Sequence, residues 1–323
     1  MSAPFLTQRQ QVALKVEGTE GTDSSPADAD VIAPVYGVDW TPTFKMNERH
    51  PEQASFSSLV NVAGTRHAVI KFETELKGSS SAGTAPFFSA ALQSCGWSVS
   101  ISTGAGTPVT LKPNSGCATP VPSCTVEVRE GEGGTAFKRK FITGARGKVT
   151  MDAVTGDTVK LKFEFTGKYN EPTETTALTS PALGVTPVPF LSAALSFLSV
   201  PTLKVHQLTF DPGVTVAIRE DANQAGGVSS AVITNRKPTG TIDPEQDLIS
   251  VLNMPNKLTE NTQGTLTFAL TGATGNIVTF TAPKVQIANI AEADRSGVRT
   301  EKLTLHFGEN AAAGDDEVSI VIT

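Results

Sequence analysis

The sequence predicts an all-β, mainly antiparallel protein, and three observations lead to this prediction. Threonine accounts for 41 of the 323 residues, and this β-branched residue favours strands. Twenty-eight glycines and 20 prolines divide the chain at frequent turns. Several segments alternate between apolar and polar residues with the period of two typical of a half-buried strand, whereas segments with helical periodicity are few and short.

The clearest alternation predicts individual strands. In three segments apolar side chains alternate with mostly charged residues or threonine: 66–77, 158–166 and 265–270. Glycine-rich turns are expected to close two hairpins between neighbouring strands: 124–129 with 135–143, and 265–270 with 277–281. These strands supply one apolar face each, so they predict a sheet with a single buried side.

Two short helices are expected beside the strands. The first covers 85–95 and ends before Gly96. The second covers 243–253 and begins at Asp243-Pro244, an N-cap residue followed by proline in the first turn. Each helix has only about three turns, so we expect both to need packing against a sheet.

The predicted elements recur in the same order in both halves of the chain. A strand, a helix, a hairpin and two further strands follow one another, the last two beginning Lys148-Val149 and Lys160-Leu161, then Lys284-Val285 and Lys302-Leu303. The repeat predicts a duplication into two tandem domains, each with one flanking helix. The expected division is a domain over 1–172, a proline-rich linker over 173–202 and a second domain over 203–323.

Two segments of the first domain show no clear periodicity. They are an N-terminal arm over 1–22 and a long loop over 42–63. Both are longer than ordinary connections inside a compact domain. We therefore expect them to become ordered by packing against neighbouring subunits.

Net charge and composition limit the classes of molecule that the protein is expected to bind. The net charge of −6 and the pI near 5.3 disfavour a nucleic-acid binder that neutralises phosphates, although they allow DNA to pass by. Three cysteines disfavour a disulfide scaffold, and neither a signal peptide nor an apolar run long enough to cross a membrane is evident. We expect a soluble protein that folds in a reducing cytoplasm and does not bind a membrane.

No residue pattern indicates an enzyme, a cofactor or a metal site. No phosphate-binding loop or nucleophile elbow is present. The four histidines lack the spacing of a zinc site: His50, His67, His206 and His306. Cys95 is expected in the core, and Cys117 and Cys124 as unlinked thiols. The acidic residues Asp28, Asp30 and 315–317 are expected to be solvated carboxylates, since calcium-loop spacing is missing. The basic run 138–140 is expected on a solvated strand face, with a nucleic-acid patch as the alternative.

Short motifs then cover the chain in a distinctive order. The stronger ones lie within 1–172, and looser ones follow at 282–285, 294–297 and 303–307. The stronger motifs include Phe5-Leu6-Thr7 and the segments 13–23, 27–32, 72–78, 83–86, 92–96, 143–149 and 163–169. In order and spacing, these motifs resemble the tail tube (major tail) proteins of long-tailed, siphovirus-type bacteriophages.

The resemblance implies a β-sandwich or half-open barrel whose subunits join sheets edge to edge into rings. Stacked rings form the tail tube of the virion, through which the genome is ejected into the host. Most members carry one domain and form hexamers, whereas a few carry two fused copies and form trimers with pseudo-sixfold symmetry. A duplicated chain would belong to the second group, so a trimeric ring is favoured over a hexamer.

The resemblance also implies partners and a location. The expected partners are other copies of the chain, the tape measure protein, and the tail terminator and distal tail proteins. Assembly would take place in the host cytoplasm, and DNA would pass through the lumen without specific binding. For self-assembly we single out eight residues: Leu14, Val16, Trp40, Phe44, Phe56, Leu59, Ile70 and Phe72.

A rival hypothesis is an adhesin of the virion or cell surface, made of immunoglobulin-like modules that bind host glycans. Tyr36 and Trp40 could form its aromatic sugar site. Residues 190–323 could alternatively be an immunoglobulin-like decoration domain on a tube protein. The predicted helix over 243–253 disfavours both alternatives, because the immunoglobulin sandwich contains no helix.

Overall fold

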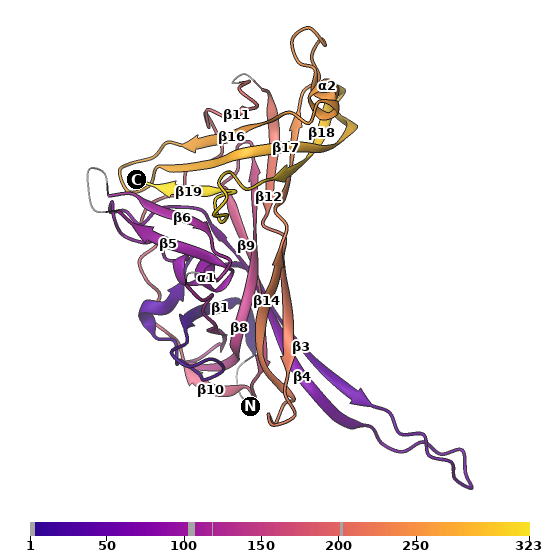
Figure 1. Ribbon diagram of the computed structural model, residues 1–323. Helices are drawn as coiled ribbons and strands as arrows, with labels where there is room; N and C mark the ends of the chain where they lie inside the picture. The colour runs from indigo at the N-terminus through magenta and orange to yellow at the C-terminus, as the bar shows by residue number, and fades with distance from the viewer. Residues whose placement is uncertain (1–3, 103–106, 118, 201–202) are drawn as a thin grey trace.

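The computed structural model describes residues 4–102, 107–117, 119–200 and 203–323, and its architecture is almost entirely antiparallel β-sheet (Figure 1). Seventeen of the described strands belong to one hydrogen-bonded network, and two more form a separate ribbon. The all-β, mainly antiparallel class expected from the sequence is confirmed. The helical elements in the described residues are short: η1 (Asp28–Asp30), α1 (Ser89–Ser94) and α2 (Met254–Thr259).

A first group of six strands comes from the N-terminal half. In spatial order they are β1 (Phe5–Val16), β7 (Cys124–Glu132), β8 (Ala136–Val154), β9 (Lys160–Tyr169), β4 (Val62–Glu75) and β3 (Tyr36–Asn47). Shorter strands extend this group: β2 (Val31–Ile32) on β1, β10 (Thr173–Thr176) on the start of β8, and the hairpin β5 (Trp97–Ile101) and β6 (Val109–Pro113). The two predicted hairpin partners at 124–129 and 135–143 lie in β7 and β8, as expected.

A second group of six strands has the same pairing order. It runs β11 (Ser196–Phe197), β16 (Gln263–Leu270), β17 (Val278–Arg295), β18 (Val298–Phe307), β15 (Thr239–Pro244) and β12 (Val205–Asp211). A short strand, β19 (Ser319–Ile322), lies on the start of β17, as β10 lies on the start of β8. The ribbon β13 (Val214–Glu220) and β14 (Val228–Arg236) is inserted between β12 and β15.

The two groups are joined by strand pairing and by a shared core. β12 pairs with the C-terminal end of β8, where Phe210 lies opposite Met151, and β19 pairs with β6. The β13–β14 ribbon packs along β8 and β9 of the first group (Figure 1). Trp97 and Phe210 meet edge to face with ring centroids 6.3 Å apart. One hydrophobic cluster therefore continues from the first group into the second.

Stacked phenylalanines fill the centre of this cluster. Phe72 lies 5.3 Å from Phe163 and 6.0 Å from Phe165, and Phe268 stacks on Phe280 at 5.0 Å. These residues occupy alternate positions of their strands, so the period of two in the sequence directly selects the buried face. Each fully buried side chain of this size stabilises the fold by about 1.5–3 kcal/mol.

The structure corrects the predicted helix over 243–253. Asp243 and Pro244 end strand β15 instead, and helix α2 begins ten residues later, at Met254. The Asn253 side chain accepts the N–H of Asn256 at 2.9 Å and proline follows in the first turn, so the same capping pattern operates at a later site. The predicted apolar stripe is not buried as a unit, because Leu248 and Ile249 are 71% and 74% exposed and only Leu252 packs against the core. The other helix, expected over 85–95, is confined to α1.

Two segments expected to lack regular structure form strands. Residues 5–16 are β1, paired with β7, and Val12, Ala13 and Leu14 in its second half are buried. Residues 42–47 and 62–63 belong to β3 and β4, so only 48–61 connect them. The outer part of this hairpin is exposed on both faces, and a strand of that kind has no apolar alternation for sequence analysis to detect. The division into 1–172, 173–202 and 203–323 stays a prediction.

Candidate assembly surfaces

The described residues contain no cluster of three or more histidine, cysteine or acidic side chains that could hold a metal ion. Cys95 and Cys124 are buried, and burial raises the pKa of the Cys124 thiol to about 12, so neither presents a reactive thiolate. Cys117 is exposed and, like the other two, is a free thiol.

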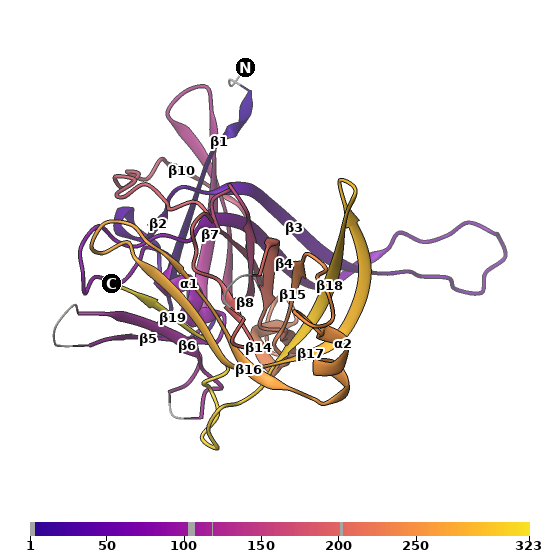
Figure 2. The same cartoon turned by 90° about the horizontal axis from the view of Figure 1, so that it is seen from above.

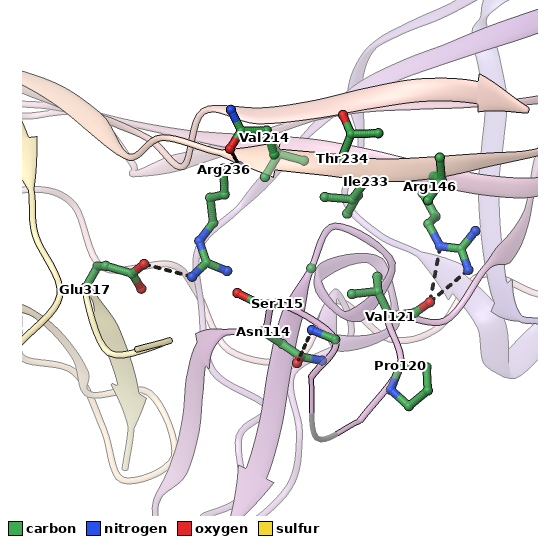
Figure 3. A pocket seen from close by; sticks show the side chains of 14 residues that line it. Asn114, Ser115, Pro120, Val121, Arg146, Val214, Ile233, Thr234, Arg236 and Glu317 are labelled. Carbon is green, nitrogen blue, oxygen red and sulfur yellow. Dashed lines mark hydrogen bonds and ion pairs between the residues drawn. The ribbon is translucent and has the colours of Figure 1, made fainter. Parts of the chain in front are cut away.

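A cleft of about 570 Å³ lies under the β13–β14 ribbon (Figure 3). Its two arginines come from opposite sides, Arg146 from β8 and Arg236 from β14. Arg146 donates to the carbonyl oxygen of Val121 at 3.0 and 3.2 Å and to that of Ala231, and it pairs with Glu20 at 2.7 Å. These bonds connect the ribbon to the first group of strands.

Arg236 forms the second anchor of the ribbon. It pairs with Asp315 at 2.7 Å and with Glu317 at 2.8 Å. Burial opposes ionisation of Asp315, but hydrogen bonds from Ser115 and Arg236 outweigh it and lower the pKa of Asp315. Asp315 was expected to be solvated, and the structure instead places it between two protein partners. The cleft is thus a seam held by ion pairs.

The basic run over 138–140 is likewise neutralised by protein partners. Arg139 pairs with Asp23 at 2.7 Å and with the fully buried Glu127, while Lys140 pairs with Glu130 at 2.6 Å. Glu127 also accepts a hydrogen bond from Arg129 at 2.6 Å. The expectation of a solvated face is wrong for Arg139 and Lys140, and the same ion pairs make this run unsuitable as a phosphate-binding patch.

The most prominent exposed feature is the outer part of the β3–β4 hairpin, which projects away from the body of the subunit (Figures 1 and 2). We call residues 41–66 the projecting hairpin. Its apolar side chains include Phe44, Met46 and Val62, which are 44%, 51% and 50% exposed. Phe56 at its tip is fully exposed. Such a concentration of exposed apolar side chains indicates an interaction surface.

An aromatic cluster holds the base of the projecting hairpin. Tyr169 of β9 lies 6.1 Å from Trp40 and 5.0 Å from Phe44, measured between ring centroids. The Arg66 guanidinium lies 5.7 Å from the Tyr169 ring. Tyr36 instead donates its hydroxyl to Glu75 at 2.9 Å. Trp40 and Tyr36 therefore do not form the exposed aromatic pair that a glycan site would require.

Several strands have an unpaired edge in the described part of the chain, including β5 and β13, and two of these open edges lie on β3 and β17. β3 pairs with β4 along one edge, and no described strand pairs with its other edge. β17 pairs with β16 only as far as Gln286, so residues 288–294 have an open edge on that side. Apart from the half-buried Ile290, the side chains of 288–294 are exposed. An open edge presents unpaired N–H and C=O groups that can pair with another chain.

The eight residues singled out for self-assembly fall into two sets. Leu14, Ile70 and Phe72 are buried in the subunit's own core, and Val16 is half-buried at the end of β1. The other four lie on β3 or the projecting hairpin, with Trp40 half-buried and three residues exposed: Phe44, Phe56 and Leu59. Sequence reasoning missed Met46, Val62 and the open edge of β17, because no alternation marks an exposed strand. Whether any of the eight contacts a neighbour stays a prediction.

None of the helices in the described residues is both long and apolar enough to cross a membrane. Comparison with known protein families matches residues 7–319 to the family described as Phage tail tube protein. No curated protein matches the chain. The family match covers nearly the whole chain and confirms the resemblance carried by the sequence motifs. The chain belongs to the phage tail tube protein family and is a structural component of the bacteriophage virion.

Proposed function

We propose that the chain assembles with copies of itself into stacked rings that form the tail tube, the conduit for genome ejection into the host. The observation that carries this proposal is the pair of open strand edges, on β3 and on β17, together with the projecting hairpin. Isolated proteins usually cover or disrupt such edges, because they otherwise promote aggregation. Two different edges on one subunit suit a head-to-tail interface, which closes into a ring when the rotation is right.

We further propose that the subunit carries two tandem tube-type domains. The identical pairing order of the two groups of strands supports this, as does the helix that follows both β4 and β15. The second domain would begin before residue 203, since β11 at Ser196–Phe197 takes the place that β1 takes in the first group. Three such subunits would form a ring with pseudo-sixfold symmetry, and six a hexameric ring.

The charge of the subunit suits a conduit for DNA. Three subunits of −6 each would give a ring a net charge of −18. An acidic lumen would repel the phosphate backbone and let DNA pass without specific binding. The tape measure protein, the tail terminator and the distal tail proteins would then meet the tube along its lumen and at its two ends.

Negative-stain electron microscopy of the purified chain, combined with mass measurement over a range of concentrations, tests the proposal. We expect rings or tubes of uniform diameter, with a mass that rises in multiples of the ring. A monomer that persists at high concentration, under conditions in which phage tails are stable, would contradict self-assembly. Binding to a glycan array by that monomer would instead favour the adhesin.

A further inference from the structure

The first and second groups of strands are joined within the chain by the pairing of β12 with β8. The matching edge on β17, the counterpart of β8, has no partner among the described strands. β8 pairs with β7 and with β12 on one side, and with β10 and β9 on the other. Its counterpart β17 pairs with β16 on the first side and with β19 and β18 on the second. The place on β17 that corresponds to β12 is empty.

The register locates this place on β17. Met151 of β8 lies opposite Leu161 of β9, and Ile290 of β17 lies opposite Leu303 of β18. Lys160-Leu161 of β9 and Lys302-Leu303 of β18 are matching residues of the two groups, so Ile290 takes the position of Met151. Asp152 pairs with Lys160, and Ala291 with Lys302, which places Ala291 at the position of Asp152.

The strand that matches β12 is β3. β12 pairs with β15 on one edge and with β8 on the other, whereas β3 pairs with β4 and has its second edge open. Thr209 and Asp211 of β12 correspond to Tyr36 and Asp39 of β3. Between those two β3 residues the register shifts by one, at a bulge where Gly37 has a φ of 57°.

We propose that β3 of one subunit adds antiparallel to the open edge of β17 in the next subunit and repeats between chains the β12–β8 junction made within the chain. The occupant is a second copy, because the same fold supplies both halves of the junction. The β12–β8 register, in which Thr209 lies opposite Asp152, then sets the intermolecular one: Tyr36 opposite Ala291, and Asp39 opposite Asn289. This inference rests on the proposed assembly into rings and specifies its interface.

The burial of side chains at the β12–β8 junction indicates which side chains of β17 the proposed β3–β17 junction would bury. Met151 and Ala153 are buried where β12 lies beside them. The corresponding part of β17, from Ile290 to Glu292, is half-buried or exposed in the isolated subunit. With three subunits, six similar junctions would alternate around the ring, three within chains and three between them.

Cysteine cross-linking tests the register. The double variant Tyr36→Cys/Ala291→Cys is prepared in a Cys117→Ser background, which leaves only the buried and unreactive Cys95 and Cys124. Directly opposite residues of an antiparallel pair are close enough for a disulfide. After assembly and mild oxidation, we expect a ladder of covalent dimers and higher species on non-reducing gels, and its loss on reduction.

A matched control separates the proposed edge from mere proximity. In Tyr36→Cys/Lys302→Cys the second cysteine lies one strand further across the sheet, about 10 Å from position 36, and should give on the order of tenfold less cross-linked product. The pair Asp39→Cys/Asn289→Cys repeats the test two positions along the register, in case the first variant does not assemble.

The outcomes distinguish the interface from the proposed function. Ladders from both designed pairs, with little from the control, support the β3–β17 junction. Tubes seen by negative stain without these ladders, or with an equal ladder from the control, overturn the junction and leave self-assembly intact. Failure of the unmodified chain to form any ring or tube overturns the proposed function and the junction together.

Discussion

The β13–β14 ribbon and the projecting hairpin extend corresponding pairs of strands in the two groups, but one is packed against the subunit and the other is largely exposed to solvent. The β13–β14 ribbon extends the pair β12 and β15, and it packs on the first group of strands with Val228 and Ala231 buried. The projecting hairpin extends the pair β3 and β4, and Phe44, Met46 and Val62 are exposed. The ribbon packs on the first group of strands along its length, whereas the projecting hairpin is supported within the chain only at its base. We propose that the projecting hairpin packs against another subunit in the assembled tube.

The contacts of the covered ribbon show what such support consists of. The Arg66 N–H donates to the carbonyl oxygen of Gly226 at 3.0 Å, and Lys168 donates to the Gln224 side chain at 2.9 Å. Ser230 is buried against Gly144 of β8. The ribbon is therefore held by hydrogen bonds and small buried residues, whereas the outer part of the projecting hairpin is surrounded by solvent.

Removing the outer part of the projecting hairpin should have the largest effect. Replacing residues 48–61 by Asn-Gly joins the last paired residues, Asn47 and Val62, by a two-residue turn. We expect the subunit to fold with its Tm within about 2 °C of the unmodified chain, since no core residue is lost. Assembly into tubes should be abolished, as measured by negative stain and sedimentation.

A full-length control distinguishes the reach of the hairpin from its side chains. In this variant Phe56, Leu59 and Val60 are replaced by serine while the length of the segment is kept. Loss of assembly in both variants indicates apolar contacts at the tip, whereas loss in the deletion alone indicates reach. Tubes that form normally from the deletion variant would contradict an assembly role for this segment.

The covered ribbon can be disturbed through one glycine. Gly144 has a φ of 58°, and an added Cβ would lie 3.0 Å from the Ser230 Cβ. Gly144→Ala should therefore lower the free energy of unfolding by about 1–3 kcal/mol, measured by urea denaturation. Gly156→Ala is the control, because Gly156 has a φ of 92° but no atom within 4 Å of the added Cβ. Equal losses in the two variants would show that the ribbon contact contributes nothing.

These two hairpins also explain how far the sequence could predict the structure. The buried faces of β4 and β9 were predictable, because Ile70, Phe72 and Phe163 alternate with polar residues. The outer part of β3 was not, because its side chains are exposed on both faces and its strand conformation depends on pairing with β4. Alternation of apolar and polar residues in a sequence indicates that one face of a strand is buried, but it does not indicate which strand the backbone pairs with.

The candidate interface was predictable only in part for the same reason. Phe44, Phe56 and Leu59 stood out as apolar residues in a segment without periodicity. The open edge of β17 carries no such mark, since Ala291 and Glu292 are unremarkable in any sequence. Asp243-Pro244 was misleading because a capping pattern is local, whereas pairing of β15 with β12 and β18 involves residues far along the chain.

Apolar side chains on the projecting hairpin should affect assembly and not folding. Met46→Ser/Val62→Ser replaces two exposed residues near the paired end of the hairpin. We expect the free energy of unfolding of the subunit to change by less than about 0.5 kcal/mol. The lowest concentration at which tubes form should rise several-fold, as measured by light scattering, because apolar area is no longer buried between subunits.

The equivalent change in the covered ribbon provides the contrast. Val214 begins β13 and is buried, so Val214→Ser should lower the free energy of unfolding by about 1–3 kcal/mol. If Met46→Ser/Val62→Ser destabilised the subunit as much as Val214→Ser, the projecting hairpin would be part of the subunit core and the comparison would fail.

Acid should weaken the covered ribbon by a smaller amount. Burial tends to raise the pKa of Asp315, but hydrogen bonds from Ser115 and the ion pair with Arg236 lower it below the ordinary value of 3.8. The folded state therefore binds a proton less readily than the unfolded state. The stabilisation that Asp315 provides is present above pH 3.8 and is lost as the pH falls through the lower, folded-state pKa.

Urea unfolding between pH 2.5 and 6 measures this contribution. Asp315→Asn should lower the free energy of unfolding at pH 6 and make it less dependent on pH below about 4 than in the unmodified chain. Asp294→Asn, at the exposed end of β17, serves as the control substitution. The projecting hairpin should not follow this acid transition, since its ion pair Arg66–Glu171 lies largely in solvent and contributes little at any pH. Acid would then loosen the ribbon that is docked within the chain and leave the open hairpin unchanged, whereas a parallel loss of both would show that the two hairpins share one support.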